Sequence, residues 1–121
     1  MNAVVAMPIR RVLLAARYSW RGLQAGWRTQ SALRYEFCIL CLVIPLAFWL
    51  GRSGVERALL IGSWLLVVVV ELINSAIETV VDRIGSELHE LSGRAKDLGS
   101  AAVLCSIVLA ATVWLLVLLD R

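Results

Sequence analysis

The chain has 121 residues, 60% of them apolar, and a formal net charge of +3. This length allows one domain, and a soluble domain of this size could not bury so large an apolar share, so the composition excludes an ordinary soluble fold and indicates an integral membrane protein. The basic residues form no cluster with interleaved aromatic residues, which argues against a nucleic-acid partner and favours membrane lipids.

The first predicted element is an amphipathic helix over residues 9–30. Apolar residues recur there at helical spacing, among them Trp20 and Trp27, and arginines line up beside them. This pattern is typical of a helix that lies in the membrane interface, with tryptophans at headgroup level and arginines toward the phosphates. The pattern is explained if the helix only binds the membrane surface. It is also explained if the arginines form part of a phosphate-binding site, and the sequence leaves both interpretations open.

Three apolar segments follow, and we predict membrane spans at 32–50, 55–81 and 98–119. A tight turn is expected at 51–54, and a polar connection at 84–99. Six arginines precede Glu36, near the start of the first span, and only two lie near the turn, so the positive-inside rule places the N-terminus and the polar connection in the cytoplasm and the C-terminus on the periplasmic side. The predicted fold class is all-α integral membrane, with three transmembrane helices and an N-terminal surface helix.

The second predicted span carries a stripe of polar groups at its cytoplasmic end. At about 100° per residue, Glu71, Ser75, Glu78 and Asp82 fall within about 60° of one another on a helix, with Asn74 at the edge. Acidic groups at membrane depth are costly, so they face protein or a water-filled cavity and indicate a functional site. Such a stripe needs a counter-charge, either a bound cation or the basic residues of the polar connection.

These groups favour metal-assisted phosphoryl transfer. The sequence has no glycine-rich phosphate loop, zinc-protease motif or serine-hydrolase motif, and its single histidine, His89, excludes a site with several histidine ligands. Carboxylates with an amide suit Mg²⁺, which prefers oxygen ligands, waters and phosphates, and Mg²⁺ with basic side chains suits phosphoryl transfer. A carboxylate in an apolar wall can also act as the general base for a hydroxyl group.

Two other classes of protein remain open on these residues alone. A small transporter could use Glu71 as a proton or cation site, but it would have little need for a charged cytoplasmic connection. A structural subunit could bury one carboxylate, but it would not need Glu71, Asn74 and Glu78 together. Glu87 and His89 can also be read as solvated residues of the connection.

The run ELINSAIETVVDRIGSELHELSGRAKDLGS at 71–100 resembles the signature of the prokaryotic membrane diacylglycerol kinase family. The shared pattern is E-x-x-N-[ST]-A-I-E-x-x-V-D, followed by H-E-L and A-K-D. The YSWRGL at 18–23 and the R-x-E at 34–36 are similar to the same family, in the same order. The resemblance covers nearly the whole chain and is to the Gram-negative diacylglycerol kinase type more than to the undecaprenol kinase branch.

The resemblance implies a homotrimer in the bacterial cytoplasmic (inner) membrane. It implies transfer of the γ-phosphate of ATP to the primary hydroxyl of diacylglycerol, which gives phosphatidic acid in phospholipid recycling. Mg²⁺ is the implied cofactor, bound with ATP. An undecaprenol kinase is the alternative within the same fold.

The resemblance also implies roles for individual residues. Glu71 is similar to the general base and Glu78 to a magnesium ligand, while Asn74, Lys96 and Asp97 complete the catalytic set. Further nucleotide contacts are implied for Arg11, Tyr18, Gln30, Glu87 and His89. Contacts to the lipid substrate are implied for Arg11, Ser19, Trp20, Arg34, Glu36, Glu71 and Ser100.

The chain departs from the family pattern at two positions. Gln30 stands where a glutamate joins Glu78 in binding magnesium; an amide oxygen can still ligate the metal but carries no charge, so we expect weaker metal binding. Leu14 stands where the family often has a lysine, and Arg10 and Arg17 are the candidates to compensate.

Overall fold

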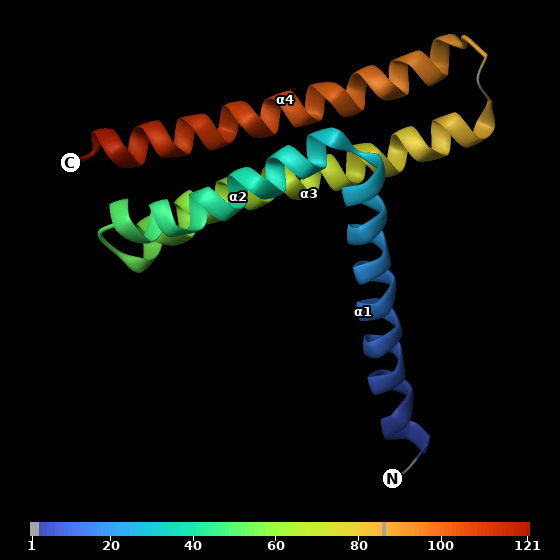
Figure 1. Cartoon of the computed structure of the whole chain (residues 1–121), viewed down its shortest axis with the longest axis horizontal. Helices are drawn as coiled ribbons and strands as arrows, with labels where there is room; N and C mark the ends of the chain where they lie inside the picture. Colours follow the sequence, from blue (N-terminus) through green and yellow to red (C-terminus); the bar gives the residue numbers. More distant parts are fainter. Residues whose placement is uncertain (1–2, 86) are drawn as a thin grey trace.

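The computed structural model describes residues 3–85 and 87–121 of the chain. α2, α3 and α4 lie side by side as a bundle, and α1 leaves this bundle at a steep angle (Figure 1). The three bundle helices are each long and apolar enough to cross a membrane. The predicted fold class, an all-α membrane protein with three spanning helices and an N-terminal helix, is therefore confirmed. The described residues contain no strand and form these helices: α1 (Ala3–Thr29), α2 (Ser31–Leu50), α3 (Gly54–Ile84) and α4 (Glu90–Leu119).

A one-residue corner joins α1 to α2. Gln30 has extended backbone (φ −116°, ψ 108°) and ends the helical run, while its N–H donates to the Gly26 carbonyl at 2.9 Å. A Cβ at Gly26 would collide with the Leu33 side chain, so the glycine lets the two helices approach. The Arg34 guanidinium reaches back from α2 and donates to the Trp27 carbonyl at 2.9 Å, which satisfies a group left free at the end of α1. These contacts hold α1 at its angle to the bundle.

The helix α1 confirms the prediction of an N-terminal helix, although it begins at Ala3 rather than at residue 9. Its side chains from Met7 to Gly22 are all exposed, including Trp20 at 63% of its full area. A helix with an apolar and a basic face is suited to lie in the plane of the membrane interface, where lipid covers the apolar face.

The central helix of the bundle is α3, which packs on both α2 and α4. The Trp64 indole N–H donates to the Glu36 carbonyl of α2 at 3.0 Å, and the Trp114 indole N–H of α4 donates to the Leu60 carbonyl of α3 at 3.0 Å. A buried indole needs a partner for its N–H, and here each finds it on the backbone of a neighbouring helix. The two bonds thus help to fix the register of the three helices. The buried apolar residues of the described chain are Leu33, Val43, Ala47, Leu60, Val67, Val68, Val81 and Ala110.

The turn between α2 and α3 is short and capped, as the sequence predicts. The Gly51 N–H donates back to the last turn of α2 at 2.8 Å, and the Ser53 hydroxyl oxygen accepts from the Glu56 N–H at 3.2 Å. The C-terminal end of α4 lies beside this turn, where Arg121 donates to the Leu50 carbonyl. This end of the bundle is therefore tied by contacts from all three helices.

The predicted connection at 84–99 is wrong in length, because α3 continues to Ile84 and α4 already begins at Glu90. The charged residues around position 90 look like a polar loop in the sequence, although α4 already begins there. His89 has extended backbone, and its Nδ1 accepts a hydrogen bond from the Leu91 N–H at 3.1 Å, so it acts as the N-cap. Glu90 and Arg94 then form an ion pair of 3.1 Å one turn apart, which supports the first turn.

Candidate active site

The predicted polar stripe lies on α3 and runs from the interior of the bundle toward the end of the helix. Glu71, Asn74 and Ser75 are buried, Glu78 is half-buried and Asp82 is exposed. The Asn74 Nδ2 donates to Glu78 Oε1 at 3.4 Å. Glu71 and Glu78 lie close enough for their charges to interact. The stripe therefore connects a buried carboxylate with the solvent at the end of α3.

A second buried carboxylate comes from α2. Glu36 is only 7% exposed, its charge interacts with that of Glu71, and its Oε2 has no hydrogen-bond partner among the described residues. The bond from Trp64 to the Glu36 carbonyl holds this part of α2 against α3. Two buried carboxylates that lie close together repel, so a proton, a cation or a polar ligand between them is stabilising.

Lys96, the lysine of the A-K-D motif, lies next to Asp82 at the solvent end of the polar stripe. Lys96 Nζ of α4 lies 2.7 Å from Asp82 Oδ1 of α3, and both side chains remain accessible to solvent. The hydrogen bond to Asp82 and the charge of that carboxylate raise the pKa of Lys96, which precedes the apolar part of α4. The ammonium group therefore stays charged at neutral pH and is available to an anionic ligand.

A small pocket at the turn between α3 and α4 gathers several of the residues implied as nucleotide contacts. It has a volume of about 170 Å³, and Asp82, Glu87, His89 and Lys96 are among the residues that line it. His89 also has the structural role described above, as the N-cap of α4. A pocket with carboxylates and a lysine can accept a phosphate group together with a cation.

Gln30 lies on the other side of the stripe. It lines a pocket of about 220 Å³ between α1 and α3, together with Ser75 and Thr79. In the described structure, Ser75 Oγ is buried without a hydrogen-bond partner, and no hydrogen bond joins Gln30 to Glu78. The single chain thus places Gln30 beside residues that flank Glu78 on α3.

The residues of α1 lie apart from the turn pocket. Arg11, Tyr18 and Ser19 are exposed on the arm that leaves the bundle (Figure 1). Asp97 and Ser100 are exposed on α4, close in sequence to Lys96. One chain therefore brings together the stripe, Lys96 and the turn pocket, and Arg11, Tyr18 and Ser19 are not among the residues that line this pocket.

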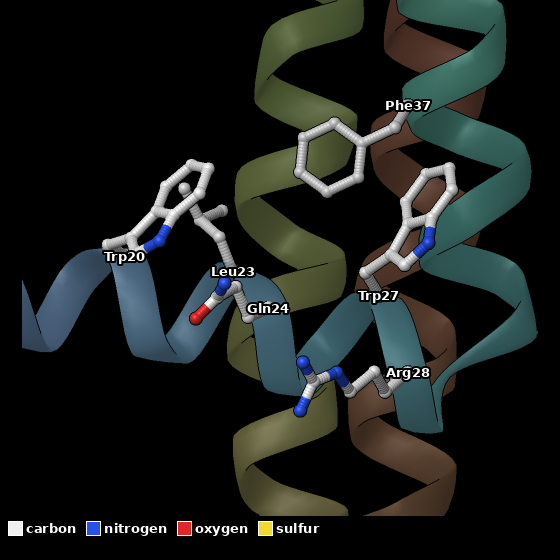
Figure 2. A pocket seen from close by; sticks show the side chains of 6 residues that line it. All are labelled: Trp20, Leu23, Gln24, Trp27, Arg28 and Phe37. Carbon is white, nitrogen blue, oxygen red and sulfur yellow. The ribbon is translucent and has the colours of Figure 1, made fainter.

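A larger, mainly apolar pocket of about 500 Å³ lies where α1 meets α2. Figure 2 shows the Trp20 and Trp27 rings on the same side of α1, with Phe37 of α2 above Trp27. The centroids of the Trp27 and Phe37 rings are 6.3 Å apart. Gln24 and Arg28 supply polar groups at the edge. An apolar pocket with a positive rim on a surface helix is suited to hold part of a lipid.

The donor groups of the stripe fit a magnesium ion that is bound together with a nucleotide. In the part of the chain that the structure describes, no three metal-ligating His, Cys, Asp or Glu side chains gather into one cluster. Mg²⁺ usually takes one or two protein carboxylates and completes its coordination with waters and phosphates. Glu78, with the Asn74 amide on one of its oxygens, offers such a partial set.

Sequence reasoning missed three contributions to this region. Arg34, for which the resemblance implies a lipid contact, also closes the corner between α1 and α2 through its bond to the Trp27 carbonyl. Thr79 lines the Gln30 pocket, one helical turn after Ser75, and the same 100° spacing that found the stripe would have found it. Gly99 packs directly on Asn74, and the sequence carries no signal for this contact between two helices.

Three helices that can span a membrane form a bundle, and an N-terminal helix lies beside it. Buried carboxylates and an amide lie within this bundle, and Lys96 of α4 meets the end of the central helix. These features define a small membrane-embedded enzyme. The model of one family, described as prokaryotic diacylglycerol kinase, matches residues 17–118. The chain belongs to the prokaryotic diacylglycerol kinase family.

Curated relatives agree with this membership over most of their length. The chain is 54% identical over 108 residues to a diacylglycerol kinase of Escherichia coli (strain K12), which covers 89% of this chain and 88% of the relative. It is 47% identical over 106 residues to a diacylglycerol kinase of Haemophilus influenzae, covering 88% and 90%. It is 43% identical over 111 residues to a diacylglycerol kinase of Pseudomonas aeruginosa, covering 92% and 90%.

Proposed function

We propose that this protein phosphorylates diacylglycerol, transferring the γ-phosphoryl group of ATP to the primary hydroxyl of the lipid to give phosphatidic acid and ADP. Family membership and the names of the relatives support this activity. The observation that carries it is the position of Glu71. This carboxylate is buried in the bundle and lies on the stripe that leads through Glu78 to Lys96.

Glu71 is the proposed general base. As the phosphoryl group moves to the lipid oxygen, the hydroxyl proton passes to the Glu71 carboxylate, and the bond from the γ-phosphorus to the bridging oxygen of ADP breaks. Glu36 lies close to Glu71, and its Oε2 has no hydrogen-bond partner among the described residues, which makes it a candidate to hold the glycerol group of the acceptor. Ser100 completes the proposed acceptor side.

The nucleotide is proposed to bind at the outer part of the stripe. Glu78 and Gln30 would hold the magnesium ion, which neutralises phosphate charge when it is bound. Lys96 would exchange Asp82 for a phosphate oxygen, a low-cost step because the pair is accessible to solvent. Further proposed contacts come from Asp97 and from the turn residues Glu87 and His89.

The lipid side of the proposed site includes α1. Trp20 and Trp27 line the apolar pocket of Figure 2, and Arg28 at its rim can pair with an anionic headgroup. Ser19 lies next to Trp20 on this helix. We infer that α1 lies at the membrane surface and guides the acyl chains of the substrate, while the reacting hydroxyl reaches Glu71.

We infer that the working form is a homotrimer in the bacterial inner membrane, with the N-terminus in the cytoplasm. Arg11 and Tyr18 are on α1, which leaves the bundle (Figure 1), and neither lines the turn pocket of its own chain, so we infer that they act toward a neighbouring subunit. Chemical cross-linking in detergent would yield a trimer band if this inference holds.

The activity is tested by lipid phosphorylation in mixed micelles. Diacylglycerol and undecaprenol are supplied separately with ATP, with and without Mg²⁺, to the wild type and to Glu71→Gln. We expect magnesium-dependent phosphatidic acid from the wild type, and a loss of about 10²-fold or more in Glu71→Gln. Product from undecaprenol alone would assign the protein to the other kinase branch. No product from either lipid, with folded protein, would favour the transporter interpretation.

A further inference from the structure

The contact between α4 and α3 is made by small residues. The buried residues of α4 are Gly99, Ser106 and Ala110. Small residues let two membrane helices approach closely, since lipid provides little hydrophobic drive for their association. Ser106 and Ala110 lie in the apolar part of α4. Gly99 differs, because it lies against a polar side chain of the stripe.

Gly99 is in van der Waals contact with Asn74. A Cβ at position 99 would overlap Asn74 Oδ1 and would lie 3.3 Å from Asn74 Cγ. No glycine in the described residues has a positive φ, so the backbone conformation at 99 is open to any residue. Space, and not conformation, therefore requires glycine at this position.

The contact between Gly99 and Asn74 sets the orientation of the Asn74 amide, with Oδ1 toward Gly99 and Nδ2 toward Glu78. Asn74 is buried, and its Oδ1 has no hydrogen-bond partner among the described residues. This oxygen rests against the backbone of Gly99, a position suited to a weak Cα–H···O contact. The other end of the amide, Nδ2, is thereby directed to Glu78 Oε1 at 3.4 Å.

We propose that Gly99 is a positioning residue, which holds the Asn74 amide so that Asn74 keeps the Glu78 carboxylate in place for the metal-bound nucleotide. The proposal rests on the function proposed above for Glu78. An alanine at 99 must displace either the Asn74 amide or α4 itself, and both changes release Glu78. Outer groups that orient a metal ligand typically change metal affinity or activity by about 10- to 100-fold when they are lost.

The first test compares Gly99→Ala with a matched control, Gly62→Ala. Gly62 is also a glycine within a membrane-spanning helix, and, apart from its chain neighbours and the backbone of its own helix, nothing in the described structure lies within 4 Å of its Cβ position. We expect Gly99→Ala to need about 10-fold more Mg²⁺ for half-maximal rate, with the KM for diacylglycerol unchanged, and Gly62→Ala to match the wild type. A lower kcat with an unchanged Mg²⁺ requirement would overturn the proposal.

A binding measurement separates this proposal from the proposed activity. Mn²⁺ replaces Mg²⁺, and electron paramagnetic resonance measures its binding to the protein in the presence of ADP. We expect weaker binding to Gly99→Ala by a similar factor and unchanged binding to Gly62→Ala. Failure of the proposed activity would appear as missing phosphatidic acid in the wild type, whereas failure of this proposal would appear as equal Mn²⁺ binding in both variants.

A double-mutant cycle tests whether Gly99 acts through Asn74. The Asn74→Ala change removes the atom that the alanine at 99 would meet. In that background, Gly99→Ala should cause no further loss in Mn²⁺ binding or in thermal stability in detergent. An equal loss in both backgrounds would assign Gly99 to helix packing alone. If Gly99→Ala does not fold, restored folding in the double variant supports the contact, and continued failure overturns it.

Discussion

Lys96 of α4 and Asp82 of α3 form a 2.7 Å ion pair at the solvent end of the polar stripe. The pair joins the two helices at the point where the turn pocket opens. Both side chains are accessible to solvent, so water and salt screen their attraction and the pair adds little to stability. We propose that the ion pair matters because it holds the Lys96 ammonium group at the turn pocket.

The two partners should therefore differ in their effects on catalysis. We expect Lys96→Gln to raise the KM for ATP and to lower kcat by about 10²-fold or more, because a positive group on the transferring phosphate is lost. Asp82→Asn should keep kcat within a few-fold of the wild type. Steady-state kinetics with varied ATP measure both. A loss in Asp82→Asn as large as in Lys96→Gln would show that Asp82 takes part in the chemistry.

The same pair predicts a pH dependence with a defined sign. The pKa of Lys96 is raised above its usual 10.5, so the contribution of the pair to stability is fully present below that value. It is lost only as the pH rises through the higher value in the folded protein. Thermal unfolding in detergent between pH 6 and 9 should therefore show the same difference between wild type and Lys96→Gln throughout. A difference that disappears within this range would contradict the assignment.

Gln30 allows a gain-of-function test of metal binding. Gln30→Glu adds a carboxylate at the corner between α1 and α2, beside Ser75 and Thr79. Because Mg²⁺ binds a charged oxygen more strongly than an amide oxygen, we expect a lower Mg²⁺ concentration at half-maximal rate. Gln24→Glu, which adds the same carboxylate on α1 at the apolar pocket, is the matched control. Equal Mg²⁺ requirements in all three proteins would remove Gln30 from the metal site.

His89 can be tested for its structural role apart from any contact with nucleotide. His89→Ala removes the N-cap of α4 and should reduce the free energy of unfolding by about 1 kcal/mol. His89→Asn keeps a capping side chain and should retain stability. Unfolding in detergent measures both, and the KM for ATP is measured on the same samples. If His89→Asn is stable but has a raised KM for ATP, the ring also contacts the nucleotide.

The bond from Trp64 to α2 should matter for stability. Trp64→Phe removes the donor to the Glu36 carbonyl and is expected to lower the free energy of unfolding by about 1 kcal/mol. Trp49→Phe is the matched control, because Trp49 is 80% exposed. Denaturant titration in mixed micelles compares the two variants. Equal stabilities would mean that the indole bond contributes nothing measurable.

Much of the fold follows from the sequence because apolar length and helical spacing are local signals. The surface helix, the three long helices and the stripe of Glu71, Asn74 and Glu78 are all visible in this way. The sequence predicts the start of α4 too late, because the first turns of this helix are rich in charged residues and depend on the His89 cap. The contact of Gly99 with Asn74 depends on how two helices meet, and periodicity within one helix carries no information about that.

The length of α3 has a consequence for depth in the bilayer. Its 31 residues extend for about 46 Å at about 1.5 Å per residue, whereas the hydrocarbon layer is only about 30 Å thick and takes about 20 residues. With Gly54 at one edge of that layer, the opposite edge falls near Asn74. Glu71 then lies just inside the hydrocarbon and Glu78 just outside it. A lipid alcohol can thus stay anchored by its acyl chains while the nucleotide stays in water, and the two meet within about two turns of a single helix.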